Sequence, residues 1–470
     1  MNKKTIGFFS GIAVFAIIYF LPIAGLSAKG QMDLALSLMT VVWWATQIAQ
    51  PAFVGGIYLM LLIIMNVATP SQVFSSAWTG SIMWLVIGAY LIAGAVNESG
   101  LGQRIAYAFI IKFVRSWKGI VISIFALTFI LALLIPHPWP RAFMIMSVIT
   151  VVAETAKMPK RDLAKLGLAV FAASCPLSGV FYTGDTSLNP LAVQASGQSV
   201  NFVSYFIYMG VPMIIAAILT MFLFLFLFKP SQEVHIDVEA LKQQQAQLGG
   251  MTGKEVRTII WLIIAIALWL TSGITGLDVG WLTLIVALMM SLPVVGGILT
   301  AKSWEGVPVN VLVFLTSAIA IGNVGGVTGM NNWIAKTLIP SNLPTNIYLL
   351  AIVITVFAMI IHMFMGSVIA VMGITIPAFV AATAHMGISP LAVSLLVFSV
   401  TNLHYILPFH NLAVLVGSDP DTGGGYTQKD VMRLGIPLTA VVFVVALVEM
   451  FWFHLVALVE MFWFHLVGLA

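Results

Sequence analysis

The chain has 470 residues, of which 61% are hydrophobic and only 8% are charged, and its formal net charge is +4. A soluble domain is about one quarter charged, and no soluble fold of this length buries so much apolar surface. The composition therefore excludes a soluble protein and predicts a chain that crosses a membrane several times. It includes no basic tract for nucleic acid, and the single cysteine, Cys175, excludes an internal disulfide.

The apolar runs are about 17–25 residues long and do not alternate with polar residues, which favours membrane-spanning helices over barrel strands. We expect an all-α polytopic protein with about 11 transmembrane helices. The first span is expected over 6–26, because its apolar core is longer than that of a usual signal peptide. Short loops rich in Lys and Arg predict an inner (cytoplasmic) membrane protein with a cytoplasmic N-terminus. Further spans are expected over 34–50, 51–67, 80–97, 166–184, 203–228, 258–275, 277–299, 308–328 and 388–407, and from 431.

An apolar segment over 119–154 is interrupted by the sequence PHPWPR at 136–141. Both ends of this segment lie next to basic loops, so we expect a re-entrant hairpin that enters and leaves on the cytoplasmic side. The prolines force a non-helical tip. Such a tip is tolerated at membrane depth only where it lines a protein-enclosed or water-filled cavity.

We expect this tip to bind an anion. The second arm begins a helix whose free N–H groups and dipole suit an anion, and Arg141 adds a full positive charge. His137 adds a hydrogen-bond donor that titrates, and Pro138 lies beside it. Two alternatives stay open: Arg141 pairs with Asp185 or Glu154 and only holds the hairpin together, or His137 has only a structural role.

A second break follows near 182–190, where the sequence reads YTGDTSLNP. It places hard oxygen ligands at membrane depth, of the kind that a Na⁺ site or a proton relay uses. The alternative is that these side chains only cap a broken helix. We predict substrate contacts for Thr186 and Asn189, and a role in binding the coupling ion or proton for Asp185, Ser187 and His137.

The chain reads as two halves joined by a soluble linker. The first half covers 1–228, and the polar stretch 229–257 is expected to be a cytoplasmic linker with one amphipathic helix. The second half, 258–456, repeats the first, since residues 77–106 resemble 303–335. Weakly similar halves with paired broken helices are typical of secondary transporters, and an odd number of spans in each half makes the repeats inverted.

The second half contains a second re-entrant hairpin over 346–385. Its expected tip, Gly366 and Ser367, is built of small residues that allow a substrate close to backbone N–H groups. His362 either faces the cavity or bonds to a neighbouring helix.

A second broken helix is expected near 404–411, where the sequence reads HYILPFHN. It has no carboxylate, and it offers His404, His410 and Asn411 in place of one. We predict substrate contacts for His410 and Asn411.

The C-terminal part contains an exact duplication, since residues 457–467 copy 446–456. A helix from 431 to 467 would be about 55 Å long, well beyond a bilayer core of about 30 Å. We assign the duplicate no function.

Together these features resemble the divalent anion–sodium symporter family, which carries dicarboxylates, citrate or sulfate. The resemblance rests on VVWWATQIAQP, on GAYLIAGAVNESGLGQRIA, on the basic amphipathic helix that follows and on the hairpin, and the second half follows in the same order. It implies an elevator-type transporter in the lipid bilayer, with a scaffold that forms a homodimer. A transport domain would hold both hairpins and both broken helices around a small anionic substrate, without a cofactor.

The chain departs from this family at the motifs that bind substrate and ion. The family places Ser-Asn-Thr at each hairpin tip, whereas the first tip here reads Pro136-His137-Pro138 and the second keeps only Ser367. Of the family's Gly-Thr-Pro-Pro-Asn stretch after each hairpin, Asn189 and Asn411 persist. Titratable or fixed charges thus replace neutral ligands. We therefore predict transport of a di- or tricarboxylate coupled to protons or to anion exchange, and not through the usual Na⁺ sites.

Three other functions were weighed. The first is a Na⁺-coupled symporter of a dicarboxylate or sulfate, and the second is a cation/proton antiporter that uses Asp185. The third, an intramembrane metalloenzyme, would need converging ligands, but the histidines lie on separate stretches with few acidic partners. We therefore predict neither an enzyme nor a metal site. The histidines considered for it are His137, His362, His404 and His410.

Overall fold

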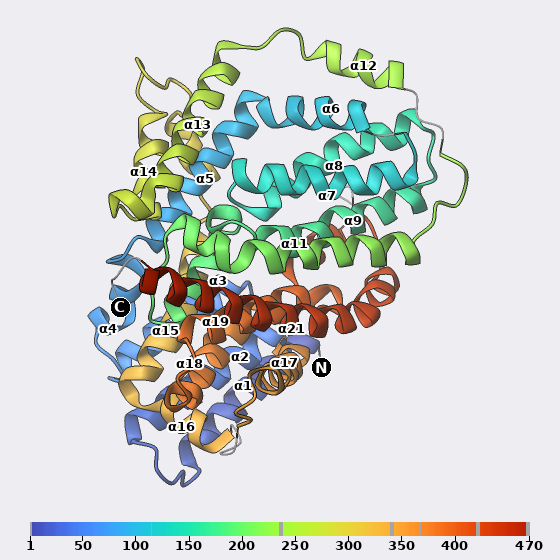
Figure 1. The fold of residues 1–470 in the computed structure, drawn as a ribbon. Helices are drawn as coiled ribbons and strands as arrows, with labels where there is room; N and C mark the ends of the chain where they lie inside the picture. The colour runs from blue at the N-terminus through green and yellow to red at the C-terminus, as the bar shows by residue number, and fades with distance from the viewer. Residues whose placement is uncertain are drawn as a thin grey trace. The chain divides into compact units, whose positions relative to one another are not determined.

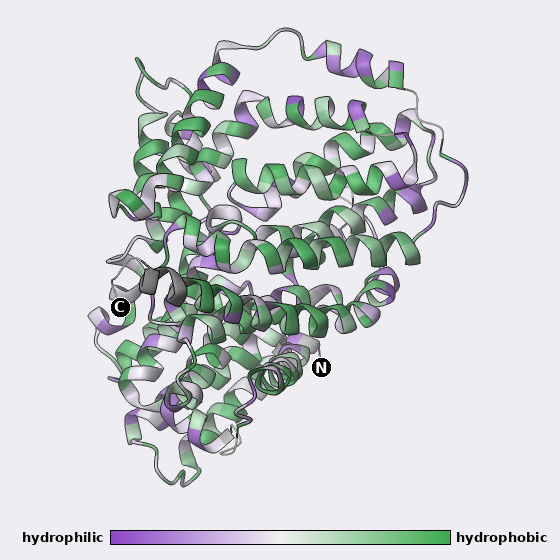
Figure 2. Ribbon diagram, viewed as in Figure 1, coloured by the Kyte–Doolittle hydropathy of each residue, from purple (hydrophilic) through white to green (hydrophobic). Residues whose placement is uncertain are grey.

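The computed structural model describes residues 2–113, 115–234, 238–338, 343–365, 368–419 and 424–466, and over these it forms helices and no strands (Figure 1). Apolar runs form helices because lipid offers the backbone no hydrogen-bond partners. Within the described chain, seven helical segments are long and apolar enough to cross a membrane, and five further apolar helices are shorter. Figure 2 shows how apolar most of them are. The all-α polytopic fold is confirmed, whereas the number of spans stays a prediction.

Contacts divide the chain into two compact units, and each is assembled from both sequence halves. Unit 1 comprises Met1–Trp84, Pro190–Ser199 and Pro308–Thr401. Unit 2 comprises Leu85–Asn189, Val200–Val307 and Asn402–Ala470. This division cuts across the two sequence halves, whose proposed boundaries stay predictions.

Unit 1 is organised around α15 (Val309–Thr328), most of whose apolar side chains are buried. Its other elements are α1 (Lys3–Phe20), α2 (Ala28–Ala45), α3 (Pro51–Ile64), α4 (Pro70–Trp78), α16 (Met330–Leu338), α17 (Ile347–Met365), α18 (Val368–Thr383), η3 (Ala384–Met386) and most of α10 (Asn189–Ala195) and α19 (Pro390–Leu403). Helix α15 packs against α2, α3, α4, α16 and α18, while α1 packs on α2 and α17 packs on α18.

Unit 2 contains the first hairpin, α7 (Trp117–Leu134) and α8 (Pro138–Thr155), which packs on α9 (Lys160–Ser178). Helix α9 begins at Lys160, before the start of the span expected over 166–184. The other elements of unit 2 are most of α5 (Ile82–Ser99), then α6 (Leu101–Phe113), η1 (Tyr182–Gly184), α11 (Phe202–Leu227), α12 (Val238–Gln247), α13 (Gly253–Thr275), α14 (Val279–Met289), η2 (Ala301–Gly306), η4 (Pro408–His410), α20 (Leu412–Gly417) and α21 (Gln428–Leu466).

The two halves share one order of elements. The series α5, α6, α7, α8, α9, η1, α10, α11 in the first half corresponds to α15, α16, α17, α18, α19, η4, α20, α21 in the second. The helix pairs α7–α8 and α17–α18 therefore stand at corresponding places in the two halves, whereas their re-entrant course stays a prediction. The elevator mechanism that the resemblance implies stays a prediction.

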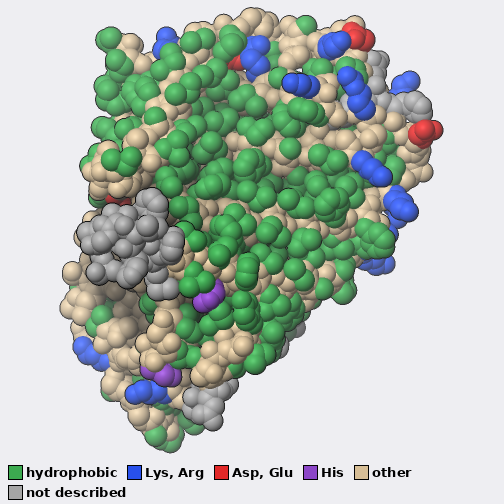
Figure 3. All heavy atoms as spheres, viewed as in Figure 1, with side chains coloured by type: hydrophobic (Ala, Val, Ile, Leu, Met, Phe, Trp, Pro, Cys, Tyr) green, Lys and Arg blue, Asp and Glu red, His purple; other side chains and the backbone are tan. Residues whose placement is uncertain are grey.

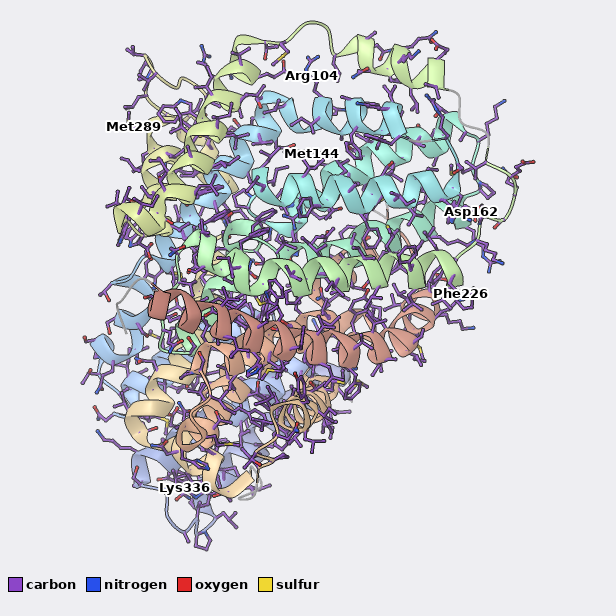
Figure 4. All side chains as sticks on the ribbon, viewed as in Figure 1. Arg104, Met144, Asp162, Phe226, Met289 and Lys336 are labelled. Carbon is purple, nitrogen blue, oxygen red and sulfur yellow. The ribbon has the colours of Figure 1, made fainter. Side chains whose placement is uncertain are left out.

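The linker contains the expected amphipathic helix, α12, and both ends of the linker are tied to unit 2. At its start, the Asp162 carboxylate of α9 accepts bonds from the N–H and hydroxyl of Ser231. At its end, Arg104 of α6 forms an ion pair with Glu255 at 2.6 Å. Its guanidinium also donates to three carbonyl oxygens over 248–250 (Figure 4). In Figure 3, Lys and Arg side chains gather along the edge that carries this linker.

Helix α21 is one continuous helix of 39 residues that runs through both copies of the duplicated sequence as far as Leu466. At 1.5 Å per residue it is about 58 Å long. The duplicate therefore lengthens an existing helix.

Candidate functional site

The first hairpin has the non-helical tip that its prolines predict. Helix α7 ends at Leu134 and α8 begins at Pro138, and the backbone of Ile135 and His137 between them is extended. The tip is buried, and the Arg141 side chain in the first turns of α8 is fully buried. A full charge without access to solvent needs hydrogen-bond partners and a counter-charge.

The start of α8 corrects one prediction, because its first three residues leave no free backbone N–H group. Pro138 and Pro140 have no N–H, and the N–H of Trp139 donates to Nδ1 of His137 at 3.3 Å. His137 is thus the N-cap of the helix. The expected cluster of backbone donors at the tip is wrong, and Arg141 is the cationic group that the tip supplies.

Tyr90 of α5 holds the other side of the His137 ring. Its hydroxyl lies 2.7 Å from Nε2 of His137, and the two rings lie 4.6 Å apart between centroids. Because Nδ1 accepts a backbone N–H, the neutral ring carries its proton on Nε2 and donates it to Tyr90. Protonation of Nδ1 would break the helix cap. This arrangement favours a structural role for His137 over a role as proton carrier.

A conservative substitution tests this role. We expect His137→Asn to keep α8 capped, since Asn is among the best N-cap residues, and to leave the pH dependence of transport unchanged. His137→Ala should lower stability by about 1 kcal/mol through loss of the cap. Thermal unfolding in detergent and initial transport rates across a pH series measure both effects. A shifted pH profile in a stable His137→Asn protein would show that the imidazole takes part in coupling.

Arg141 joins the hairpin tip to the first break. Its Nη1 donates to the carbonyl oxygens of Ile135 at 3.0 Å and Gly184 at 3.2 Å. No ion pair forms between Arg141 and either carboxylate that was considered as its partner, although the charge of Asp185 attracts it. Its Nε and Nη2 are buried and have no hydrogen-bond partner among the described residues. These two atoms share one edge of the guanidinium, the edge that binds a carboxylate in a bidentate manner.

The first break lies directly against the tip. Thr186 donates its hydroxyl to the carbonyl oxygen of Pro136 at 3.2 Å. Oδ1 of Asp185 accepts the N–H groups of Ser187 at 2.9 Å and Leu188 at 3.1 Å, which shapes the turn. Gly184 permits this close packing, since a Cβ there would lie 2.6 Å from the carbonyl oxygen of Ser178.

The two asparagines that persist from the family motif close the two breaks in a similar way. Nδ2 of Asn189 donates to the carbonyl oxygens of Ser178, Phe181 and Tyr182 around the end of α9. Nδ2 of Asn411 donates to the carbonyl oxygen of Asn402 near the end of α19, and its Oδ1 caps α20. Each side chain therefore ties its break back to the preceding helix.

The second break adjoins the same end of α9 as the first. Nδ2 of Asn402 donates to the carbonyl oxygen of Cys175 at 2.7 Å, and α20 packs against α9. Nδ1 of His410 accepts the N–H groups of Ile406 and Leu407, so this histidine, like His137, serves as a backbone acceptor.

The predicted tip of the second hairpin, Gly366 and Ser367, lies outside the described residues. In the part of the chain that is described, no three His, Cys, Asp or Glu side chains come together as metal ligands. The substrate and ion contacts predicted for the site residues stay predictions.

Five buried side-chain atoms at the tip and the first break have no hydrogen-bond partner among the described residues: Nε and Nη2 of Arg141, Oγ1 of Thr183, Oγ of Ser187 and Oδ1 of Asn189. Buried polar atoms are nearly always paired, and an unpaired one costs about 1–3 kcal/mol. The group combines guanidinium and hydroxyl donors, which can pair with an anion, with one amide oxygen, which can only accept a hydrogen bond.

Three residues of this region were missed by the sequence reading. Tyr90 lies within an apolar span, where only its hydroxyl distinguishes it. Thr183 comes just before Asp185 in the first break, and Asn402 comes just before His404 in the second. Because a side chain's partner on another helix has no local sequence signal, Tyr90 could not have been matched with His137.

An all-helical membrane protein with paired hairpins and paired broken helices belongs to the class of secondary transporters. The model of the family described as the sodium:sulfate symporter transmembrane region matches residues 2–459, so the chain belongs to this family.

The chain is similar to dicarboxylate transporter 1 of Spinacia oleracea chloroplasts, with 26% identity over 407 residues, which cover 82% of this chain and 70% of that protein. It is similar to the L-tartrate/succinate antiporter of Escherichia coli, with 24% identity over 93% of this chain and 95% of the antiporter. The solved YdaH transporter of Alcanivorax borkumensis matches 91% of this chain and 99% of its own, at 13% identity and a TM-score of 0.49. The family and the two dicarboxylate-type relatives are named as transporters, so the chain is a membrane transporter and not an enzyme.

Proposed function

We propose that this protein is a secondary active transporter of a small divalent organic anion, a di- or tricarboxylate, and that Arg141 binds one of its carboxylates. The observation that carries the proposal is the fully buried guanidinium whose Nε and Nη2 have no hydrogen-bond partner within the described part of the chain. A bidentate carboxylate would satisfy both atoms and place a negative charge in direct contact with the guanidinium.

The relatives support a carboxylate substrate. Their names specify dicarboxylates or tartrate and succinate, whereas the family is named for sulfate. The Nε and Nη2 donors of an arginine can bind either a carboxylate or a sulfate. The remaining unpaired atoms, two hydroxyls and an amide oxygen, suit a substrate that also carries hydroxyl or carboxylate groups at its other end.

We infer that Asp185 is the proton carrier. Its negative charge acts on Arg141, so the carboxylate and an incoming anion compete for one cation. An anion therefore binds best when Asp185 carries a proton. The alternatives are Na⁺-coupled symport, as the family name states, anion exchange, as in the E. coli relative, and cation/proton antiport through Asp185.

The distribution of basic residues supports a membrane location and an orientation of the chain. Basic residues before α7 and after α8 favour the inner membrane, with both ends of the hairpin and the N-terminus in the cytoplasm. The homodimer rests on the family resemblance alone.

A thermal-shift screen of the purified protein in detergent tests substrate and coupling together. Succinate, malate, citrate, sulfate and a sulfonate are compared with acetate, each in Na⁺ or K⁺ at equal ionic strength and at two pH values. A ligand that binds only the folded state raises the melting temperature. We expect a dicarboxylate to stabilise the protein equally in Na⁺ and K⁺, and more at the lower pH. Stabilisation that requires Na⁺ would refute proton coupling, and stabilisation by sulfate alone would refute the carboxylate substrate.

A further inference from the structure

Unit 1 contains a pocket of about 540 Å³ in which none of the proposed transport residues takes part. It is lined by the end of α1 and the turn after it, by α2, by α16 and by Ile374 of α18. Helix α16 is the counterpart of the basic amphipathic helix α6 in the repeat, and it is itself short and amphipathic, with the sequence MNNWIAKTL. Such helices lie at membrane interfaces.

The lining is almost entirely apolar. Its two hydroxyl side chains are Ser37 and Thr337. The hydroxyl of Ser37 is bonded to Tyr58 at 3.1 Å and to the buried carboxylate of Asp33 at 3.4 Å, so it is already engaged outside the pocket. The indole N–H of Trp333 donates to the carbonyl oxygen of Ala24. The walls therefore favour an apolar ligand, because a polar one would find few partners.

Exposed apolar side chains lie next in sequence to residues that line the pocket. Ile18 and Leu21, which line it, belong to the same stretch as Ile17 and Phe20, whose side chains are 61% and 79% exposed. In a membrane transporter, exposed apolar side chains of this kind contact acyl chains. The molecules with direct access to the pocket are therefore membrane lipids.

Two exposed lysines in the segments that line the pocket indicate which lipid it binds. The lining segments over 18–38 and 330–338 carry three charged residues: the buried Asp33 and two exposed lysines, Lys29 and Lys336. Lys336 precedes the lining residue Thr337 on α16 and is labelled in Figure 4. We propose that this pocket binds one acyl chain of an anionic phospholipid, with the phosphate held near these lysines.

Filling the pocket tests the proposal. Thr337→Phe adds bulk from an exposed position on α16, and Leu38→Trp adds it from α2 on another wall. Leu349→Phe is the matched control, since Leu349 is 55% exposed on α17 and is not part of the lining. The full-length proteins are purified in detergent, titrated with phosphatidylglycerol or phosphatidylcholine and examined by native mass spectrometry.

We expect the wild type and Leu349→Phe to retain one phosphatidylglycerol, and each filling variant to need at least tenfold more lipid for the same occupancy. Lys29→Gln with Lys336→Gln should retain a lipid but lose the preference for phosphatidylglycerol over phosphatidylcholine. Equal retention in the wild type and both filling variants, or no retained lipid in the wild type, would overturn the lipid site. An unchanged preference in the double lysine variant would overturn the headgroup assignment.

Discussion

Arg141→Gln is expected to abolish anion transport and to remove the stabilisation of the protein by its substrate, while the protein still folds. The wild-type guanidinium is fully buried, and two of its nitrogen atoms have no hydrogen-bond partner among the residues that the structure describes. Loss of a bidentate contact to a charged carboxylate costs about 3 kcal/mol, or roughly a hundredfold in affinity. The measurements are uptake of labelled dicarboxylate into proteoliposomes and the thermal shift on adding the same anion.

Two further variants separate binding from folding. Arg141→Lys keeps the charge, and its ammonium can replace the bonds to the carbonyl oxygens of Ile135 and Gly184. It lacks the planar edge, so we expect a folded protein with weakened anion binding. Arg161→Gln removes an exposed arginine at the start of α9 and should transport like the wild type. Normal uptake by a folded Arg141→Gln protein would show that the substrate binds elsewhere.

Sequence patterns were sufficient to predict the class of fold and the non-helical tip after α7. Apolar run length predicts helices in lipid, and proline at 136, 138 and 140 predicts a non-helical tip, because no tertiary context restores the missing N–H groups. The structure has that tip at 135–137 and has breaks between α9 and α10 and between α19 and α20. These features are local, so the local sequence determines them.

The lack of free backbone N–H groups at the start of α8 follows from the local sequence. Helix N-termini bind anions through free N–H groups, but PHPWPR supplies prolines at the first and third helical positions. The remaining N–H, that of Trp139, is capped by the residue just before the helix, as an N-cap position predicts. Residues 136–141 therefore supply no free backbone donors, and Arg141 is left as the group that can bind an anion.

Contacts between distant segments were beyond prediction. The bond between Tyr90 and His137 joins helices 47 positions apart, and that between Asn402 and Cys175 joins the two halves. Such pairs depend on how helices pack, and nothing in either local sequence specifies the partner. The division into two compact units, each built from both sequence halves, also depends on how the helices pack.

Asp185→Asn is expected to uncouple transport from the proton gradient while keeping the fold. The amide oxygen of Asn can accept the N–H groups of Ser187 and Leu188 as the carboxylate does, so the turn survives. The negative charge that competes with the substrate for Arg141 is lost. We expect anion affinity at neutral pH to rise about tenfold, which corresponds to about 1.4 kcal/mol, and to become independent of pH.

The measurement is dicarboxylate binding and uptake at several pH values, with and without an imposed proton gradient. Asp185→Asn should still exchange internal for external anion, because exchange needs only the anion site. It should no longer accumulate anion when the gradient is applied. Glu305→Gln is the control, since it neutralises an exposed carboxylate in η2 that has no part in the proposed site. Gradient-driven accumulation that persists in Asp185→Asn would exclude Asp185 as the carrier. If that accumulation then required Na⁺, transport would be coupled to sodium, as the family name states. In that case Na⁺, and not a proton, would neutralise charge on the bound dianion, even though the hairpin motifs of the family are absent.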